Sequence, residues 1–419
     1  MTEPISEKNL QEHLKDKQLY IWGSGHLGVT LLKRLLRQGI TVTAYLDSTP
    51  RSAQVSGYPV LNADTILQNP SPRIFIIIAA ALYEAEIAGS CQKYGLTENQ
   101  NFIRLSELKP YHFEIDVAGV CNLRCATCPR GNSPVSYNDG LMSLDTYRMT
   151  LDKILQEYPF LPDIQLYSWG EPLLNRDLAS MIRYTNDCDV SVAISSNLSL
   201  TVNLETIVKA QPQWFRISAS GFGERYPVMH KGGRWDLVYA NMQELARCRD
   251  LYAPQMIIEL NYHIYKHNID DIRKMQDFCA EHGFLFQANF AFIDPLDLLL
   301  EYRKTGYLPQ AVQETCNQLM ISLEDACKEA ERQKDAFCPC INNICISADL
   351  RVMNCSHLFN PECNTMSPNF LEIPFAELHQ RMRTRSACTE CRSYSLNSFY
   401  NIYLSKGVSE IPMNDKDAI

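Results

Sequence analysis

The sequence lacks a hydrophobic run long enough to cross a membrane. Its longest apolar run, from Ile74 to Leu82, is about half the length of the roughly 20-residue stretch that a membrane-spanning helix needs. The first eight residues are charged and lack the apolar core of a signal peptide. These absences predict a cytoplasmic protein with no membrane partner, and they assign the apolar run to a buried parallel strand.

The sequence also lacks a run of Lys and Arg residues of the kind that follows a phosphate backbone. Its formal net charge is −9 at pH 7, which argues against nucleic acid as the main partner. It contains no low-complexity tract and no short-period repeat. With 419 residues, we expect two to three globular domains with a large buried core.

Cysteine, in contrast, is abundant. The 16 cysteines without an export signal indicate reduced thiols and metal ligation rather than disulfides. Cys121, Cys125 and Cys128 form a C-x3-C-x2-C motif directly after the alternating segment 113–117. Thiolates select iron–sulfur clusters, zinc or copper(I), and closed sites usually take four protein ligands. Three thiolates can hold three irons of a cubane and leave the fourth iron open for a small molecule.

This triad, placed in a loop after a first strand, resembles the radical S-adenosylmethionine (SAM) superfamily. The resemblance implies a [4Fe–4S] cluster at Cys121, Cys125 and Cys128 whose open iron is chelated by SAM. An electron from the reduced cluster then cleaves SAM to methionine and a 5′-deoxyadenosyl radical. The alternatives are a zinc knuckle or three cysteines that only pack in a core.

Repeated strand–helix units follow the first hundred residues. Strands are expected at 113–117, 164–167, 190–195, 214–218, 255–263 and 284–291, and helices at 144–158, 178–186, 204–209, 237–249 and 269–281. Strands separated by helices predict parallel pairing through crossovers. Six such units fit an incomplete (βα)6 barrel, the fold that the resemblance implies.

In parallel barrels the reactive groups lie at the carboxyl ends of the strands. The second expected strand is followed by the W-G-E-P segment Trp169, Gly170, Glu171 and Pro172. This segment resembles the family's GGEP motif, which holds the amino group of SAM, although Trp169 replaces the first glycine. The alternative is an ordinary turn in which Pro172 begins a helix.

Polar residues also follow the next three strands. The resemblance assigns SAM contacts to Ser195, Ser196, Asn197 and Ser218, with Lys231 or Arg234 neutralising the SAM carboxylate. Solvated loop charges are the alternative for Lys231 and Arg234. His263 and Tyr265, after the fifth strand, are candidates for an acid or a base, and their alternative is packing or hydrogen bonding.

The N-terminal hundred residues carry a different motif. A strand at 18–22 leads into Gly23, Gly25 and Gly28, a helix through residue 36, and a second strand that ends at Asp47. This is a dinucleotide-type fingerprint and predicts a Rossmann-like fold, with Asp47 placed for a ribose hydroxyl. The region resembles small Rossmann-like domains of carbohydrate-modifying enzymes, which implies a nucleotide-sugar ligand. A docking module without a ligand is the alternative.

A second cysteine set follows the expected barrel. After a helical stretch expected at 311–335, a β-hairpin is expected with its turn near 349–351, and Cys388 and Cys391 form a C-x2-C pair. The arrangement resembles the SPASM/twitch extension of radical SAM enzymes, which implies one auxiliary [4Fe–4S] cluster, although Leu350 replaces the family's glycine in the turn. Its ligands are Cys355, Cys388, Cys391 and one of three others: Cys338, which the spacing favours, then Cys340 or Cys345. A structural zinc site is the alternative.

These observations predict an α/β protein with a Rossmann-like domain (1–108), a partial barrel (109–310) and a twitch-like extension (311–419). The resemblance implies hydrogen abstraction from a small molecule, with oxidation of a sugar, nucleotide-sugar or cyclitol carbon as the first choice and the auxiliary cluster as electron acceptor. A reductase, flavodoxin or ferredoxin would supply electrons. The alternatives are a ribosomal-peptide maturase, a carbohydrate epimerase or dehydratase, and a non-catalytic iron–sulfur or zinc protein.

Overall fold

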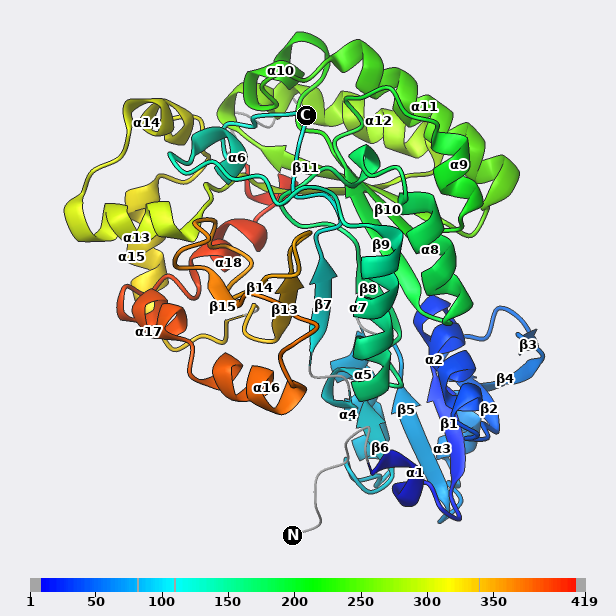
Figure 1. Ribbon diagram of the computed structural model, residues 1–419. Coiled ribbons are helices and arrows are strands. Elements are labelled where there is room, and N and C mark those ends of the chain that lie inside the picture. Colours follow the sequence, from blue (N-terminus) through cyan, green and yellow to red (C-terminus); the bar gives the residue numbers. More distant parts are fainter. Residues whose placement is uncertain (1–8, 81–82, 109–110, 339, 412–419) are drawn as a thin grey trace. The chain divides into compact units, whose positions relative to one another are not determined.

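The computed structural model describes residues 9–80, 83–108, 111–338 and 340–411 (Figure 1). The charged start of the chain, the end of the apolar run at 81–82 and the expected domain boundary next to residue 109 lie outside the described residues. The chain forms two compact units. One comprises Met1–His112, Arg148–Ile164 and Tyr184–Val192, and the other comprises Phe113–Tyr147, Gln165–Arg183 and Ala193–Ile419.

The first unit contains a six-stranded sheet in the order β3-β4-β2-β1-β5-β6. Its strands are β1 Gln18–Trp22, β2 Ala44–Asp47, β3 Gln54–Val55, β4 Tyr58–Asn62, β5 Ile74–Ile78 and β6 Phe102–Arg104. β1 is parallel to both β2 and β5. All five residues of β5 are buried, and alternate residues belong to two separate hydrophobic cores. The apolar run therefore forms the buried parallel strand that the sequence predicts.

Among its described residues before His112, the first unit also contains five short to medium helices. They are α1 Leu10–His13, α2 His26–Arg37, α3 Ala63–Leu67, α4 Glu84–Lys93 and α5 Leu105–Leu108. α2 follows the glycine-rich turn and buries Leu31, Leu32 and Leu35 on one face. This spacing is that of an amphipathic helix packed on a sheet.

The second sheet has nine strands in the order β12-β11-β10-β9-β8-β7-β13-β14-β15. Its first six in the chain are β7 His112–Ile115, β8 Asp163–Gln165, β9 Ser191–Ser196, β10 Trp214–Ser218, β11 Ile257–Ile264 and β12 Leu285–Phe290. The β7–β8, β9–β10, β10–β11 and β11–β12 pairs are parallel. The predicted mixed α/β fold with parallel strands is confirmed.

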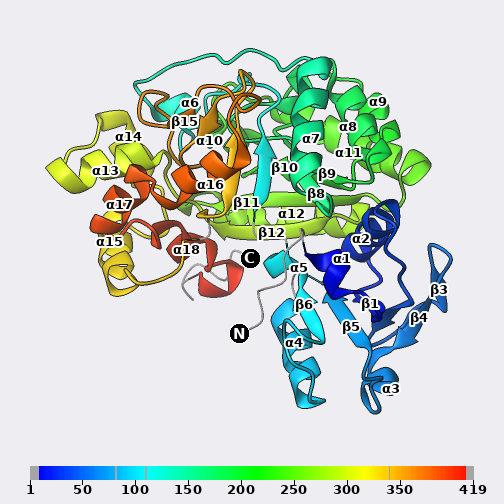
Figure 2. The ribbon, with the colours of Figure 1, turned by 60° about the horizontal axis from the view of Figure 1, so that its bottom comes forward.

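The helices between these strands are α6 Pro129–Asn132, α7 Leu144–Glu157, α8 Leu178–Asp187, α9 Leu204–Lys209, α10 Tyr226–Met229, α11 Trp235–Tyr252 and α12 Ile272–His282. Within the second unit, α9 and α11 pack against each other (Figure 2). Short 3-10 helices occur at η2 Pro172–Leu174, η3 Gly223–Arg225 and η4 Lys266–Asp271. η4 explains why α12 begins three residues after the predicted start at 269. Within the described residues, no helix is long and apolar enough to cross a membrane.

The C-terminal elements extend the second sheet beyond β7. β13 Asn343–Ile346 lies beside β7, where the Asp116 N–H donates to the Ile346 carbonyl at 2.8 Å. β13 pairs antiparallel with β14 Val352–Met353, which confirms the predicted hairpin, and β15 Thr365–Ser367 follows. In the turn, Leu350 has a φ of +71°, the left-handed conformation that glycine adopts most easily. This accounts for the glycine that the resemblance places there.

The prediction of one helical stretch over 311–335 is wrong. Two helices form there, α14 Gln310–Cys316 and α15 Leu323–Arg332. The Ser322 hydroxyl accepts a hydrogen bond from the Asp325 N–H at 3.1 Å and so begins the second helix as its N-cap. The remaining helices are α13 Leu296–Thr305, α16 Phe375–Arg383, α17 Ser386–Ser393, α18 Phe399–Leu404 and the short η5 Val408–Glu410.

Candidate active site

The loop after β7 carries the cysteine triad and is fixed by backbone hydrogen bonds to distant segments. The Arg124 N–H donates to the Lys231 carbonyl at 2.9 Å, and the Ala126 N–H donates to the Met229 carbonyl at 2.8 Å. The Thr127 carbonyl accepts from the Asp294 N–H at 3.0 Å. The loop is therefore held between residues 229–231 and the segment after β12.

Cys121 lies beside the end of β9. Its sulfur is 3.5 Å from the Leu123 N–H nitrogen and 3.8 Å from Asn197 Nδ2. Asn197 Nδ2 also donates to Asn122 Oδ1 at 2.9 Å, and Asn122 donates to the Ser199 carbonyl at 2.8 Å. Two N–H groups thus point at the Cys121 sulfur, an arrangement that stabilises a thiolate.

Cys125 Sγ also has a nitrogen partner, since it lies 3.4 Å from His230 Nδ1. Cys128 makes no capping hydrogen bond with α6, although the nearby backbone N–H of Arg130 lowers its pKa. Burial nevertheless raises the pKa of Cys128 to about 12. Buried thiolates of this kind need a positive charge in addition to N–H donors. The donor set therefore fits cysteines that ligate iron.

Gly170 of the W-G-E-P segment lies against the loop that carries the triad. A Cβ atom at this position would lie only 1.4 Å from the Ala118 carbonyl oxygen. Trp169 precedes it, and its carbonyl accepts from Arg130 Nε at 3.0 Å. The Trp169 ring lies edge-on to Phe359. The close approach is made by the second residue of the motif, so a tryptophan at the first position is compatible with it.

Glu171 joins the ends of two strands. Its carboxylate oxygens accept from the Leu173 N–H at 3.0 Å and from the Asn197 N–H at 2.9 Å. Its own N–H donates to the Val120 carbonyl at 2.8 Å. Burial raises the pKa of Glu171 to about 7, and the two N–H donors oppose that shift. The carboxylate thus positions Asn197, while the backbone N–H of Glu171 binds the triad loop through Val120.

The serines predicted at the strand ends lie on the same edge as the triad. Ser195 Oγ and Ser218 Oγ are 3.4 Å apart on the neighbouring strands β9 and β10. Ser196 Oγ accepts from the Leu198 N–H at 3.0 Å. The structure therefore gathers the W-G-E-P segment, the Ser-Ser-Asn segment and the triad at one edge of the parallel strands.

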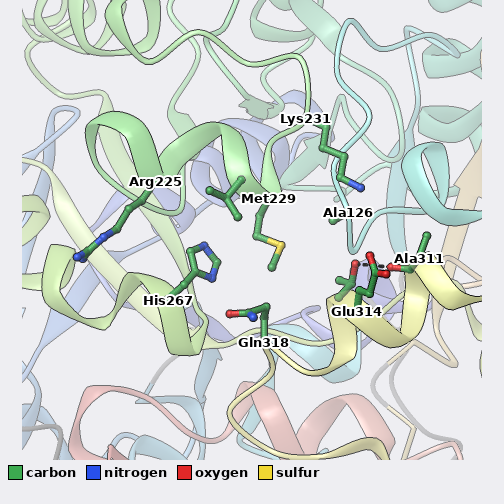
Figure 3. Close-up of a pocket in the computed structure, with 10 residues that line it drawn as sticks. Ala126, Arg225, Met229, Lys231, His267, Ala311, Glu314 and Gln318 are labelled. Carbon is green, nitrogen blue, oxygen red and sulfur yellow. Dashed lines mark hydrogen bonds between the residues drawn. The ribbon is translucent and has the colours of Figure 1, made fainter.

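The side chains of Lys231 and Arg234 have different surroundings. The Arg234 guanidinium is 67% exposed and pairs with Asp236 at 2.6 Å. Lys231 lines a cavity of about 420 Å³ together with His267 and Glu314 (Figure 3). Ala126, between two cysteines of the triad, lines the same cavity. Of the two predicted cations, Lys231 is the one whose side chain borders the triad loop.

His263 and Tyr265 are both committed to contacts within the fold. The Tyr265 hydroxyl lies 2.9 Å from Thr127 Oγ1, inside the triad loop. The His263 backbone N–H donates to Ser220 Oγ at 2.9 Å, and burial lowers the pKa of the His263 imidazole to about 4. Tyr265 therefore supports the loop, while the His263 ring lies with its Nε2 3.3 Å from Asn261 Nδ2.

A charged network inside the parallel strands was not predicted from the sequence. Arg216 on β10 lies 3.7 Å from Glu259 on β11 and hydrogen-bonds to Tyr167 after β8. Phe215 and Ile217, on either side of Arg216, are fully buried. Because side chains alternate along a strand, a charge between two buried apolar residues points to the opposite face. This alternation is the signal that could have revealed the network.

Four cysteines of the second set line one cavity. Cys388 and Cys391 lie on α17, Cys355 follows β14, and Cys338 follows α15. The neighbouring Cys340 thiol lowers the pKa of Cys338. Among the described residues, no three His, Cys, Asp or Glu side chains are close enough to hold a single metal ion. The four cysteines thus line a common cavity.

Cys345 is directed elsewhere. Its thiol donates to Glu114 Oε2 at 3.2 Å, while Asn343 donates to Glu114 Oε1 at 2.7 Å. Burial raises the pKa of Glu114. Cys345 is not among the residues that line the cavity, whereas Cys338 is. Of the three candidates for the fourth ligand, Cys338, which the sequence spacing favours, lines the cavity with Cys355, Cys388 and Cys391.

Three further residues connect the two cysteine sets. His357 Nδ1 lies 3.1 Å from Asp294 Oδ1, and the imidazole stacks on Tyr400 with ring centroids 3.7 Å apart. Asp294 binds the triad loop through Thr127, and His357 is two residues after Cys355. Burial opposes a charge on His357, but Asp294 raises its pKa overall. Because Asp294, His357 and Tyr400 are far apart in the sequence, no local pattern predicts their contact.

The glycine-rich turn of the first unit has the predicted geometry. Gly23 has a φ of +122°, and a Cβ at Gly28 would lie 1.9 Å from the Gly23 carbonyl oxygen. α2 begins directly after Gly25. The Asp47 carboxylate accepts from the Ser24 hydroxyl and from the Thr49 N–H, each at 2.9 Å. The turn, the helix start and the acidic residue therefore meet at one place.

Comparison with solved structures finds similar chains. BtrN, solved with AdoMet and 2-DOIA, is 14% identical over 70% of this chain and 89% of its own, with a TM-score of 0.39. The protein anSMEcpe, solved with AdoMet and the Cp18Cys peptide, is 14% identical over 68% and 87%, with a TM-score of 0.45. SuiB from Streptococcus suis, bound to S-adenosylmethionine, is 13% identical over 65% and 71%, with a TM-score of 0.41. No protein-family model matches the sequence. These structural neighbours are radical SAM enzymes, the family that the cysteine motif resembles.

Proposed function

We propose that the chain is a radical SAM enzyme in which Cys121, Cys125 and Cys128 hold a [4Fe–4S] cluster. SAM would bind the fourth iron of this cluster, which has no cysteine ligand. One observation carries the proposal: the three cysteines lie in a single loop at the carboxyl ends of parallel strands, and the sulfurs of Cys121 and Cys125 have nitrogen partners within 3.5 Å. When bound, the cluster would supply the electron that cleaves SAM to methionine and a 5′-deoxyadenosyl radical. A reductase, flavodoxin or ferredoxin would supply that electron.

The residues of the chain would hold and orient SAM. Gly170 permits the W-G-E-P backbone to lie directly on the triad loop, and Glu171 fixes that backbone to Asn197. Ser195 and Ser218 present hydroxyls next to this edge. Lys231, beside the triad loop, is the better placed of the two candidate partners for the SAM carboxylate. Preorganised contacts of this kind lower the cost of orienting a substrate.

We propose a second [4Fe–4S] cluster at Cys338, Cys355, Cys388 and Cys391. The support is their common cavity and the direction of Cys345 away from it. Four thiolates are a ligand set for a [4Fe–4S] cluster and for a structural zinc ion, and the cluster proposed at the triad favours iron–sulfur here too. The contacts among Asp294, His357 and Tyr400 lie between the two cysteine sets and would exclude water from the space between them.

The substrate class that we propose is a hydroxylated small molecule such as a sugar, nucleotide-sugar or cyclitol, oxidised at a carbinol carbon. Loss of one hydrogen atom, one proton and one electron converts a carbinol into a carbonyl, so an electron acceptor is required. The second cysteine set is the candidate site for that acceptor. The polar side chains of Tyr167, Arg216 and Glu259 inside the strands suit hydroxyl groups. Within the first unit, the Gly23–Gly28 turn with Asp47 is a separate candidate site for a nucleotide-sugar.

Two other functions would use the same two cysteine sets. A ribosomal-peptide maturase would need a peptide-binding region, and a carbohydrate epimerase would need a hydrogen donor such as the buried thiol of Cys345, which faces Glu114. A maturase would form product only with peptide substrates. An epimerase would form a product of the same oxidation state as its substrate.

Anaerobic reconstitution followed by iron and sulfide analysis tests the proposal. We expect about eight irons and eight sulfides per chain, as two [4Fe–4S] clusters require. Screening nucleotide-sugars, cyclitols and short peptides for substrate-dependent 5′-deoxyadenosine release would then identify the substrate class. Stoichiometric zinc without sulfide would overturn the assignment of both sites.

A further inference from the structure

The contact between Cys125 and His230 differs from the other contacts of the triad. The nearest N–H partner of Cys121 is the backbone of Leu123 in the same loop, and Cys128 makes no capping hydrogen bond with α6. The partner of Cys125 is the imidazole of His230, which lies 105 residues further along the chain. Cys125 Sγ and His230 Nδ1 are 3.4 Å apart. A side chain can be changed by mutation without altering the loop, so this contact can be tested directly.

The surroundings of His230 determine which ring nitrogen carries the proton. The backbone N–H of Ser220 donates to His230 Nε2 at 3.0 Å. Nε2 must therefore present its lone pair, because an N–H there would face another N–H. A neutral imidazole has one N–H, which then lies on Nδ1. That proton is directed at the sulfur of Cys125.

The ring is held in this orientation from a second side. It stacks on Tyr226 with centroids 4.5 Å apart and an interplanar angle of 16°. The His230 backbone N–H donates to the Tyr226 carbonyl at 3.2 Å. Gly233 lies against the same tyrosine, since a Cβ there would be 2.5 Å from Tyr226 Cε1. The imidazole is thus fixed by Ser220, Tyr226 and the backbone, and rotation would break these contacts.

We propose that His230 is a positioning residue that raises the reduction potential of the cluster held by the triad, by donating its Nδ1–H to the Cys125 sulfur. This rests on the proposed function, because it concerns the same cluster. Reduction adds one negative charge that is shared by the cluster and its thiolates. An N–H donor stabilises the reduced form more than the oxidised form, and hydrogen bonds to sulfur are among the determinants of such potentials.

Two substitutions separate the hydrogen bond from the rest of the side chain. In His230→Gln, the side-chain amide can reach the Nε2 position and keep the bond with Ser220, but no donor remains at the Nδ1 position. In His230→Asn, an amide N–H can occupy the Nδ1 position. Tyr226→Phe is the control, because it keeps the stacking ring and leaves both hydrogen bonds of His230 in place.

The measurement is an EPR-monitored potentiometric titration of the anaerobically reconstituted holoenzyme, with SAM added to identify the cluster that binds it. We expect the potential of the SAM-responsive cluster to become more negative in His230→Gln and to stay near the wild-type value in His230→Asn and Tyr226→Phe. The potential of the second cluster should not change in any variant. An unchanged potential in His230→Gln, or equal shifts in His230→Gln and His230→Asn, would overturn the proposal.

A second measurement needs no variant and covers the case in which His230→Gln takes up no iron. The wild-type holoenzyme, labelled with ¹⁵N-histidine, is reduced and studied by pulsed EPR. We expect coupling of the SAM-responsive cluster to one histidine nitrogen and to one exchangeable proton. Absence of both couplings contradicts the role of His230 only. Absence of any SAM-responsive cluster in the wild-type protein contradicts the proposed function instead.

Discussion

The two cysteine sets are built in different ways. The first lies in one short loop after β7, and its neighbours Gly170, Glu171 and Asn197 come from the ends of adjacent parallel strands. The second is assembled from three separate segments: the end of α15, the end of β14 and the helix α17. The first set therefore depends on local spacing and on strand order. The second depends on the packing of the whole C-terminal region.

The two cysteine sets also differ in the chemical groups that surround them. The sulfurs of Cys121 and Cys125 have nitrogen partners at close range, and the adjoining edge of the strands offers hydroxyl and amide groups. The cavity of the second set is lined by Leu296, Ile341, Ala387, Arg392 and Asn397 in addition to its cysteines. A polar, partly open surrounding suits a centre that binds a small molecule. The second set has apolar residues together with one arginine and one asparagine around it, and such surroundings tune the properties of a metal centre.

The largest effect is expected from Gly170→Ala, which disturbs the first set alone. The new methyl group would overlap the Ala118 carbonyl, so the W-G-E-P segment must move away from the triad loop. We expect a loss of SAM cleavage of at least about 100-fold, since misplacement by about 1 Å can cost this much. The measurement is 5′-deoxyadenosine release after chemical reduction.

Gly89→Ala is the matched control for this variant. Gly89 lies in α4, and a Cβ there would meet no atom within 4 Å. We expect unchanged SAM cleavage and equal or higher stability, because alanine favours helices over glycine by about 1 kcal/mol. Full SAM cleavage in Gly170→Ala would show that the close approach to the triad loop is not needed.

Cys388→Ala should disturb the second set alone. We expect the iron content to fall to about half, as one of two [4Fe–4S] clusters is lost. SAM cleavage should continue while formation of the oxidised product stops. Cys363→Ala serves as the control, because Cys363 is exposed and does not line the cavity. Loss of SAM cleavage in Cys388→Ala, with iron retained at the triad, would contradict the separate roles of the two sets.

Glu171 gives a pH-dependent test of the first set in the metal-free protein. Its pKa is about 7 in the folded state, against about 4.3 in an unfolded chain. The folded state then binds more protons than the unfolded state between these values, so this group makes stability fall as pH rises from about 4.5 to 7. We expect Glu171→Gln to reduce that fall, measured by urea unfolding at pH 5 and pH 7.5.

The exposed Glu281→Gln on α12 is the control for the pH experiment and should leave the slope unchanged. If the two variants show the same dependence as the wild type, the Glu171 carboxyl is not buried as the hydrogen bonds to Leu173 and Asn197 indicate.

The smallest effect is expected in the hairpin that leads to Cys355. Leu350 has a positive φ, which costs a non-glycine residue about 1–2 kcal/mol. Leu350→Gly removes this strain but also removes a half-buried side chain, whereas Leu350→Ala removes only the side chain. We therefore expect Leu350→Gly to be about 1 kcal/mol more stable than Leu350→Ala in denaturant unfolding. Equal stability would show that the turn is not strained.

Several features could be predicted because they depend on nearby residues. The apolar run at β5, the alternation of strands and helices, the cysteine triad and the polar strand ends are all local patterns. Other features depend on contacts between distant segments. The approach of His230 to Cys125 and the stacking of His357 on Tyr400 have no local pattern. Ser322 begins a second helix within a stretch whose composition favours one, because its side chain caps the backbone.

The most direct test of the central claim compares SAM cleavage in the reconstituted wild type, Cys125→Ala and Cys388→Ala under the same chemical reductant. We predict 5′-deoxyadenosine from the wild type and from Cys388→Ala, and none from Cys125→Ala, since only the triad would hold the cluster that binds SAM. Continued 5′-deoxyadenosine formation in Cys125→Ala, or none in a wild type that contains its full iron and sulfide, would contradict the account.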